Sequence, residues 1–405
     1  MIIIKNVFNF TGQVVQWEVP STENRIIDAK GLTLFPALID PHVHFRTPGL
    51  EHKENWNTGA LAAIYGGITT VFDMPNTLPP CITEERLKQK KQIINQQLQE
   101  IGIPLHYHLY LGADKYHFDQ IYKCRQEIIG LKVFMGASTG DLVMDDDSSL
   151  HAAFSLAKAH NLVLAVHAED EEKILERKAL FKDRKDYKVH SEIRNCEVAV
   201  IAVQKALELA KIYKTRLYLL HLSTKKEIDL VRQAKKEGVC VFAETTPHHL
   251  FLNDTAYETL NGKAQVNPPL RTPLDNEALW EAIHDGTIDM IGSDHAPHTI
   301  EEKKLAYGQC PSGLPGIQTT LPLLLNAHHE KKITLDKIVK LMKFNIENLF
   351  HLLPNDDVVL VDLACEKKIE DRNMKTKCGW TPYAGRILKG WPITTILRGK
   401  IYELD

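Results

Sequence analysis

Two histidines placed two residues apart are the clearest sign of chemistry in this chain. The segment Asp40-Pro41-His42-Val43-His44-Phe45-Arg46 follows a short apolar run. In an extended chain, residues two apart point to the same side, so His42 and His44 can both reach one metal ion. Imidazole nitrogens are ligands that zinc prefers in proteins. The pair is short enough to occur by chance, so its meaning depends on what other segments bring to the same place.

Further candidate ligands follow, or lie within, other apolar runs. They are His167 in VLAVHAED, His221 in LYLLHLS, Asp294 in MIGSDHAPH and Lys132 in GLKVFMG. A single histidine at a strand end is more often a hydrogen-bonding residue than a ligand. A lysine ammonium repels a metal ion and becomes a ligand only if carbon dioxide carbamylates it. The alternative for Lys132 is a structural lysine in an ion pair.

The elements that must position these residues are eight β-rich runs that alternate with amphipathic stretches. This alternation predicts an α/β fold with a parallel sheet, and eight units predict a closed (β/α)₈ TIM-like barrel. A doubly wound open sheet also satisfies the pattern. In a barrel the functional face lies at the C-terminal ends of the strands, where the candidate ligands would gather on one rim. The predicted strands are Phe35 to Ile39, Ile68 to Phe72, Leu105 to Tyr110, Leu131 to Phe134, Leu162 to Val166, Leu217 to Leu220, Val239 to Ala243 and Ile288 to Ile291.

Both ends of the chain differ from the middle. Short antiparallel strands are predicted within the first 30 residues, in VVLVDL near residue 360 and in ITTILRGKIY near residue 396. Neither end is large enough to bury a core of its own, so one small β-sandwich built from both termini is the economical interpretation. We therefore assign residues 1–38 and 355–405 to the sandwich and residues 39–354 to the barrel. The Gly/Pro-rich stretch 308–316 is the best candidate for a mobile active-site loop.

Composition and charge narrow the class of protein. Among 405 residues, 44% are hydrophobic and 25% charged, which is typical of globular proteins. The formal net charge of −3 gives no reason to expect nucleic acid or an anionic membrane as a partner. No apolar stretch reaches membrane-spanning length, and the start lacks the features of a signal peptide. Seven scattered cysteines without a CxxC pair fit reduced thiols in the cytoplasm. We expect a small-molecule substrate; a homodimer is left open, because the sequence does not specify the oligomeric state.

Seven separated segments resemble the amidohydrolase superfamily and, within it, the dihydroorotases. They occur in the family's order and cover the chain from residue 40 to about 300, and CGWTPYAGRILKG (378–390) is similar to part of the family's small β-domain. The resemblance implies a zinc-dependent enzyme that cyclises N-carbamoyl-L-aspartate to L-dihydroorotate, reversibly, in pyrimidine biosynthesis. The segments are DPHVHFRTPG (40–49), GGITTVFDMPNTLPP (66–80), KVFMG (132–136), VHAED (166–170), HLS (221–223), VNPPLR (266–271) and GSDHAPH (292–298).

The resemblance also implies ligand roles, residue by residue. His42, His44 and Asp294 correspond to ligands of one zinc ion, and His167 and His221 to ligands of a second, with carboxylated Lys132 and a hydroxide as bridges. Asp294 would also accept a proton from the attacking water and return it to the ring nitrogen. One departure concerns the bridge, because many close dihydroorotases use an aspartate from another loop where this chain offers Lys132.

Substrate contacts are implied for Arg46, Asn76, Asn267 and His298. Arg46 is suited to bind a carboxylate through two hydrogen bonds. Its alternative is a structural pair with a local acid such as Asp40 or Glu51. Asn76 and Asn267 each stand beside proline, which is also the usual place for an asparagine that forms a turn.

Two other functions remain open. An allantoinase or a hydantoinase-like dihydropyrimidinase would share the metal ligands, but allantoin and hydantoin lack the carboxylate of dihydroorotate. A metal-free scaffold protein of the same fold is a further possibility, since fold does not fix function, although every expected ligand is retained. The remaining histidines are expected to be structural. Among these, His248 and His249 follow the seventh predicted strand and could reach the rim.

Overall fold

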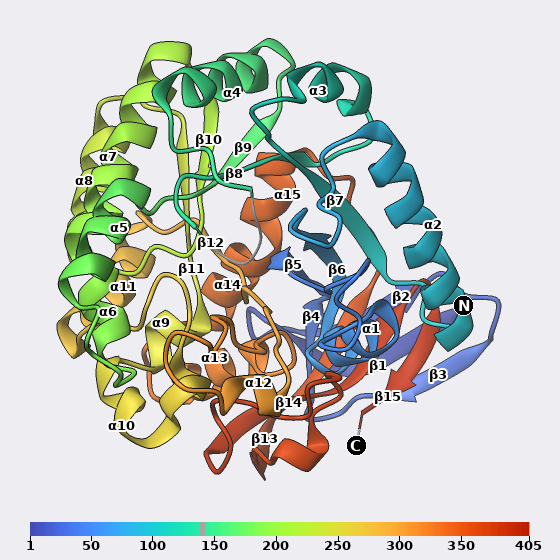
Figure 1. The fold of residues 1–405 in the computed structure, drawn as a ribbon. Coiled ribbons are helices and arrows are strands. Elements are labelled where there is room, and N and C mark those ends of the chain that lie inside the picture. The colour runs from blue at the N-terminus through green and yellow to red at the C-terminus, as the bar shows by residue number, and fades with distance from the viewer. Residues whose placement is uncertain (138–141, 405) are drawn as a thin grey trace.

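Eight parallel strands form the central sheet (Figure 1). The computed structural model describes residues 1–137 and 142–404. Each strand pairs with the next along the chain, so the order of strands in the sheet, β5 to β12, follows their order in the sequence. This is the arrangement predicted from the alternating pattern, and the eight-strand barrel is confirmed. The strands are β5 (Leu38–Val43), β6 (Ile68–Asp73), β7 (His106–Gly112), β8 (Gly130–Phe134), β9 (Val163–His167), β10 (Arg216–Leu219), β11 (Val241–Thr245) and β12 (Met290–Ile291).

The two edge strands of this sheet meet just beyond β12. Val43 forms an isolated parallel bridge with His295, and the backbone N–H of His44 donates to the His295 carbonyl at 2.8 Å. Inside the same junction, the Asp40 carboxylate accepts hydrogen bonds from the backbone N–H groups of His42 and Ser293. The sheet is therefore nearly closed into a barrel at the place where the HxH segment approaches the segment after β12.

Helices surround the strands, and Figure 1 shows α2, α4, α7 and α8 along the outside of the barrel. Their ends carry the expected signals, as in α8, where Thr224 and Glu227 form a capping box. No helix of the described residues is both long enough and apolar enough to cross a bilayer. The helices are α1 (Trp56–Tyr65), α2 (Glu84–Ile101), α3 (Phe118–Cys124), α4 (Asp147–Ala159), α5 (Glu171–Leu180), α6 (Val189–Ile193), α7 (Cys196–Tyr213), α8 (Lys225–Lys236), α9 (Pro247–Phe251), α10 (Tyr257–Leu260), α11 (Pro273–Asp285), α12 (Ile300–Lys303), α13 (Thr320–His329), α14 (Leu335–Val339) and α15 (Asn345–Phe350), with short 3₁₀ turns η1 (Asp254–Ala256), η2 (Asn261–Ala264) and η4 (Asp371–Asn373) and the π-helical turn η3 (Lys340–Phe344).

The interior of the barrel is a packed core that is covered at one end by α15. Phe350 of this helix lies 4.9 Å from the ring of Phe72 and 5.8 Å from that of Tyr218, measured between ring centroids. Arg216, the first residue of β10, donates to the carbonyl of Leu349. Since α15 lies at the N-terminal ends of the strands, the opposite, C-terminal rim is the end that is left for chemistry.

Strands from both ends of the chain form a second sheet, and Figure 1 shows these blue and red strands side by side. Its order is β15-β14-β13-β4-β1-β2, with β3 paired to β1. The prediction that both termini build one small β-unit is confirmed, and the unit expected as a β-sandwich is one mostly antiparallel sheet, in which β1 runs parallel to β3 and β4. All seven strands belong to one hydrogen-bonded sheet. They are β1 (Ile2–Asn9), β2 (Val14–Val19), β3 (Arg25–Asp28), β4 (Thr33–Pro36), β13 (Val358–Lys368), β14 (Ile387–Leu397) and β15 (Lys400–Glu403).

The first predicted strand, Phe35 to Ile39, is divided between the two sheets. Phe35 belongs to β4 and pairs with β13, whereas Ile39 belongs to β5 and pairs with β6. Between them the backbone N–H of Ala37 donates to the carbonyl of Asp357, so the chain changes partners there. The apolar run is continuous because both strands are buried, and hydrophobicity alone therefore did not reveal the change of sheet.

A buried ion pair anchors the segment that carries His44 and Arg46. Asp73 ends β6, and its Oδ1 accepts a hydrogen bond from the backbone N–H of Phe45 at 2.7 Å. Its Oδ2 lies 2.5 Å from Nζ of Lys90 on α2, and both side chains are buried. Lys90 also donates to the carbonyl of Met74 at 2.9 Å. The pair thus fixes the backbone between the second histidine and the arginine.

We predict that Lys90→Met lowers the free energy of unfolding by about 3–5 kcal/mol, because it leaves the carboxylate of Asp73 buried without its counter-charge. Chemical denaturation measures this. Lys88→Met on the same helix removes an exposed ion pair with Glu84 and is the matched control, with a stability close to that of the wild type. Two variants of equal stability would show that the buried pair does not anchor the segment.

Candidate active site

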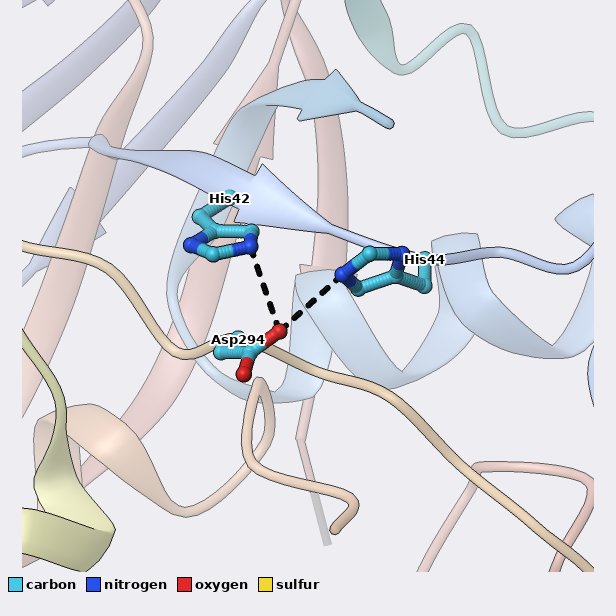
Figure 2. A group of neighbouring side chains, drawn as sticks. All are labelled: His42, His44 and Asp294. Atoms are coloured by element: carbon cyan, nitrogen blue, oxygen red, sulfur yellow. Dashed lines mark ion pairs between the residues drawn. The ribbon is translucent and has the colours of Figure 1, made fainter. Parts of the chain in front are cut away.

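His42, His44 and Asp294 lie together at the C-terminal rim of the barrel (Figure 2). Nε2 of His42 is 3.2 Å, and Nε2 of His44 is 3.0 Å, from the same Oδ1 of Asp294. All three side chains are buried, and one ligand atom from each lies within 4.8 Å of the others. Two imidazole nitrogens and a carboxylate oxygen at this spacing are a donor set that suits zinc.

The protonation of His44 favours a cation between these groups. Burial lowers the pKa of His44 to about 3, so its ring is neutral near pH 7. Its Nδ1 lies 2.8 Å from Oδ1 of Asn76, and a neutral ring that donates there carries its lone pair on Nε2. That lone pair then faces an oxygen of Asp294 at 3.0 Å. Two acceptors at this distance repel one another unless a cation lies between them, so the residues fit a metal ion.

His167 and His221 form a second pair beside the first. His167 Nδ1 is 2.9 Å from His221 Nε2, and the rings of His42 and His221 are 5.5 Å apart between centroids. Burial lowers the pKa of both His167 and His221, which keeps the rings neutral, the form in which imidazole binds metals. His167 Nε2 lies 3.0 Å from Oε2 of Glu169, so donation to that carboxylate leaves the lone pair on Nδ1.

Glu244 holds His42, and the neighbouring histidines lower the pKa of Asp294. Nδ1 of His42 lies 2.8 Å from Oε1 of Glu244, and Glu244 also accepts a hydrogen bond from the backbone N–H of His221 at 3.0 Å. Burial opposes the charge on His42, but Asp294 and Glu244 raise its pKa. Burial would likewise raise the pKa of Asp294, but the neighbouring histidines, with His42 first, hold it well below its ordinary value. Asp294 is therefore ionised.

Lys132 lies on β8, with 1% of its surface exposed. Within residues 1–137 and 142–404 no carboxylate comes within ion-pair distance of it, and its Nζ lies 4.4 Å from the centroid of the Phe134 ring. Burial lowers the pKa of Lys132 to about 7, against the opposing charges of Asp294 and Glu244. The alternative of a structural ion pair for Lys132 therefore finds no partner among the described residues. The lowered pKa favours the neutral amine, which is the form that reacts with carbon dioxide.

Backbone conformation sets three of these residues apart. Arg46, His221 and Asp294 have φ angles of 61°, 38° and 44°. Residues other than glycine rarely adopt this left-handed region, and such conformations gather at functional sites where the surrounding structure imposes them. Arg46 therefore does not continue the extended conformation of His42 and His44, as the spacing argument assumed. Its side chain nevertheless lines the same cavity as His44 and Asp294.

Arg46 is a buried cation without a carboxylate partner among the described residues. It is 2% exposed, its Nε donates to the Pro297 carbonyl at 3.2 Å, and its Nη1 is buried with no hydrogen-bond partner. Burial lowers the pKa of Arg46 to about 10, which leaves it charged near pH 7. No carboxylate of the described residues lies within ion-pair distance of Arg46; Asp40 accepts from His42 and Ser293, and Glu51 accepts from Gly49.

The remaining predicted substrate residues lie around the same cavity or against it. Asn76 and Asn267 line the cavity with His44, Arg46 and Asp294. Oδ1 of Asn267 lies 2.9 Å from Nε2 of His190. His298 is fully buried, with its Nε2 3.1 Å from Nη2 of Arg46. Neither His248 nor His249 belongs to the ligand cluster found among the described residues.

The Gly/Pro-rich stretch 308–316 reaches this cavity through Ser312 and Gly313. A Cβ at Gly313 would lie 2.3 Å from the Ala296 carbonyl oxygen and 3.0 Å from Nε2 of His298, and its φ is 145°. Only glycine therefore lets this loop lie so close to the cavity. The placement agrees with an active-site loop; its mobility stays a prediction.

Two carboxylates of the site were missed by the sequence analysis. Glu244 lies in β11, one residue beyond the end of the predicted seventh strand, and Glu169 lies two residues after His167. A charged residue at a strand end was the same signal that identified the other candidates.

Comparison with known proteins agrees with this geometry. The family model described as the amidohydrolase family matches residues 33–352. The chain is 35% identical to the dihydroorotase of Methanosphaera stadtmanae, over 94% of this chain and 87% of that protein. It is 36% identical to the dihydroorotase of Pyrococcus furiosus, over 94% of this chain and 83% of that protein. Among solved structures, the L-hydantoinase (dihydropyrimidinase) from Arthrobacter aurescens is similar, with a TM-score of 0.93 and 28% identity over 100% of this chain and 96% of that one.

We predict that His44→Ala and His221→Ala each lose bound zinc and nearly all hydrolytic activity, because each removes a neutral imidazole from a cluster of few ligands. Elemental analysis of the purified variants measures the zinc, alongside a turnover assay. His151→Ala, which removes an exposed histidine that contacts Tyr213, is the matched control and should keep both. A variant of the cluster that retains full zinc and the wild-type rate would show that its histidine is not a ligand.

Proposed function

Because the chain belongs to the amidohydrolase family, we propose that it works as a dihydroorotase. In this reaction N-carbamoyl-L-aspartate closes to L-dihydroorotate, and the reverse direction opens a cyclic amide with water. Hydrolysis needs a strong nucleophile, a polarised carbonyl and a proton for the departing nitrogen. The residues on the rim supply candidates for each need, and the two dihydroorotases that are about a third identical to the chain support the choice of substrate.

The observation that carries this proposal is the buried guanidinium of Arg46, which has no described carboxylate within ion-pair distance. A buried charge is stabilised only when it is paired, and Nη1 of Arg46 has no partner in the described part of the chain. It lines a cavity with His44 and Asp294. An anionic group on the substrate would complete the pair, and a carboxylate matches the fork of the guanidinium. Dihydroorotate carries such a carboxylate beside its cyclic amide.

We propose that the metal is zinc and that two ions bind. His42, His44 and Asp294 would hold one ion and His167 and His221 the other, with Lys132 as a carboxylated bridge. Zinc supplies a nucleophile near neutral pH, by lowering the pKa of water, and polarises the amide carbonyl. Support for the bridge comes from the burial of Lys132 and from its lowered pKa, which favours the reactive amine.

The proposed work of the chain's own residues is proton transfer and orientation. Asp294 is ionised and would accept a proton from the attacking water at Oδ1 or Oδ2, then return it to the nitrogen that leaves. Arg46 would hold the substrate carboxylate, with Asn76, Asn267 and His298 around it. The hydrogen bonds that His167 and His42 donate to the carboxylates of Glu169 and Glu244 fix the orientation of the two rings.

Hydantoinase activity is the second candidate, because a solved L-hydantoinase shares the whole fold. Hydantoin has no carboxylate, so it would leave Arg46 buried and unpaired. Parallel assays with dihydroorotate, hydantoin and allantoin, with zinc content measured on the same preparation, distinguish the candidates. Turnover of hydantoin or allantoin without turnover of dihydroorotate would overturn the proposal.

We further propose that the enzyme works in the cytoplasm, that the barrel unit comprises residues 39–354 and that residues 1–38 and 355–405 form the β-unit. The reducing compartment is supported by the cysteines, since all seven are free thiols. The division is supported by the change of sheet between β4 and β5.

Arg46→Ala tests the role of the guanidinium. We predict a fall in kcat/KM for dihydroorotate of roughly ten- to more than hundredfold, the loss of a charge-assisted hydrogen bond. Arg46→Lys keeps the charge but loses the fork, so it should recover only part of the rate. Zinc content and melting temperature should stay near those of the wild type. Equal losses on dihydroorotate and on an uncharged cyclic amide would show that Arg46 is structural.

Lys132→Ala tests the proposed bridge. We predict that the variant loses zinc and activity, because an alanine cannot be carboxylated, and that acetate or propionate restores part of both by taking the place of the missing carboxylate. The wild type with the same acid is the control and should not gain activity. A Lys132→Ala protein with full zinc and the wild-type rate would contradict the bridge.

A further inference from the structure

Another buried lysine, Lys53, contacts the side of His298 that faces away from Arg46. Nζ of Lys53 lies 3.1 Å from Nδ1 of His298 and 3.0 Å from Oε1 of Glu302. Lys53 is 8% exposed and His298 is fully buried. Two consecutive backbone hydrogen bonds, from Leu50 to Arg46 and from Lys53 to Leu50, connect this lysine to the arginine. Lys53 therefore belongs to the same turn as Arg46, but it does not line the cavity that Arg46 lines.

The contact with Lys53 determines which nitrogen of His298 carries a proton. An ammonium group has three donors and no acceptor, so Nζ of Lys53 donates and Nδ1 of His298 accepts. Burial, reinforced by the charge of Arg46, lowers the pKa of His298 well below its ordinary value, so the ring is neutral and carries one N–H. That N–H must be on Nε2, where it lies 3.0 Å from the Ser312 carbonyl oxygen.

The carboxylate of Glu302 favours the other tautomer of His298, in which Nδ1 carries the proton. Its Oε2 lies 3.7 Å from Nδ1 of His298, which is beyond hydrogen-bond distance, but a small rotation would bring the two within reach. Without Lys53, a proton on Nδ1 could be donated to this carboxylate. Nε2 would then carry a lone pair, and Nη2 of Arg46, 3.1 Å away, would donate to it. One N–H group of Arg46 would then be taken by His298 and lost to the substrate carboxylate.

We propose that Lys53 is a positioning residue that holds His298 in the tautomer with its proton on Nε2, so that His298 donates to the Ser312 carbonyl and leaves Nη2 of Arg46 free to donate to the substrate carboxylate. The inference rests on the proposed function, because it takes dihydroorotate as the substrate. Lys53 does not touch the substrate in this account. It acts through His298, and its loss should therefore weaken substrate binding more than it slows the chemical step.

The test compares the KM and kcat for dihydroorotate among four variants. Lys53→Met removes the donor and should raise KM by about tenfold or more, with kcat changed far less. Lys53→Arg keeps a donor and should recover most of the affinity. Glu302→Gln keeps Lys53 and should resemble the wild type. The double variant Lys53→Met/Glu302→Gln removes the competing acceptor as well, and its KM should fall between those of Glu302→Gln and Lys53→Met.

Lys343→Met is the matched control, because Lys343 is also buried and paired with a glutamate, Glu347 at 3.2 Å, but belongs to η3. It should leave KM unchanged. If Lys53→Met does not fold, Glu302→Gln and the double variant are compared with each other, since neither leaves the Glu302 charge unpaired. A KM within twofold of the wild type in Lys53→Met, or equal KM values in that second comparison, overturns the inference. A wild type that does not turn over dihydroorotate overturns the proposed function and this inference together.

Discussion

The junction between β5 and the segment after β12 is the contact on which the site depends. Asp40 is buried there and accepts hydrogen bonds from the backbone of His42 and of Ser293, which is 253 positions away in the sequence. Beside it, Val43 pairs with His295, so that the HxH segment and Asp294 are held on one rim. The left-handed backbone at Asp294 turns its carboxylate towards both histidines. Without this closure, His42 and His44 would lie at one edge of an open sheet and Asp294 at the other.

Burial and neighbouring charges together set the charge of each group on the rim. It keeps His44, His167 and His221 neutral and lowers the pKa of Lys132 to about 7, whereas the histidines keep Asp294 ionised. Arg46 stays charged and has no carboxylate partner within the described residues. Neutral imidazoles beside a carboxylate favour a metal ion, and an unpaired guanidinium favours an anion. A cyclic amide that carries a carboxylate satisfies both requirements at once.

The sequence predicted the strands and most of the rim because each depends on local information. Apolar runs predicted the barrel strands, and their positions at the ends of these runs identified His167, His221 and Asp294 as candidates. The division of Phe35 to Ile39 between two sheets was not predictable, because partner choice depends on β13, far away in the chain. The absence of a described carboxylate partner for Arg46 was not predictable either, because it depends on the tertiary contacts that Asp40 and Glu51 make instead. The contact of Lys53 with His298 joins two loops whose approach only the closed barrel creates.

The most direct measurement compares kcat/KM of the zinc-loaded wild type for L-dihydroorotate and for 5,6-dihydrouracil, which has the same ring without the carboxylate. The pair isolates the group that Arg46 is proposed to bind and leaves the amide chemistry unchanged. The account predicts that dihydroorotate is favoured by roughly ten- to more than hundredfold, the value of a charge-assisted hydrogen bond in the transition state. Equal values for the two substrates, or a preference for dihydrouracil, would contradict it.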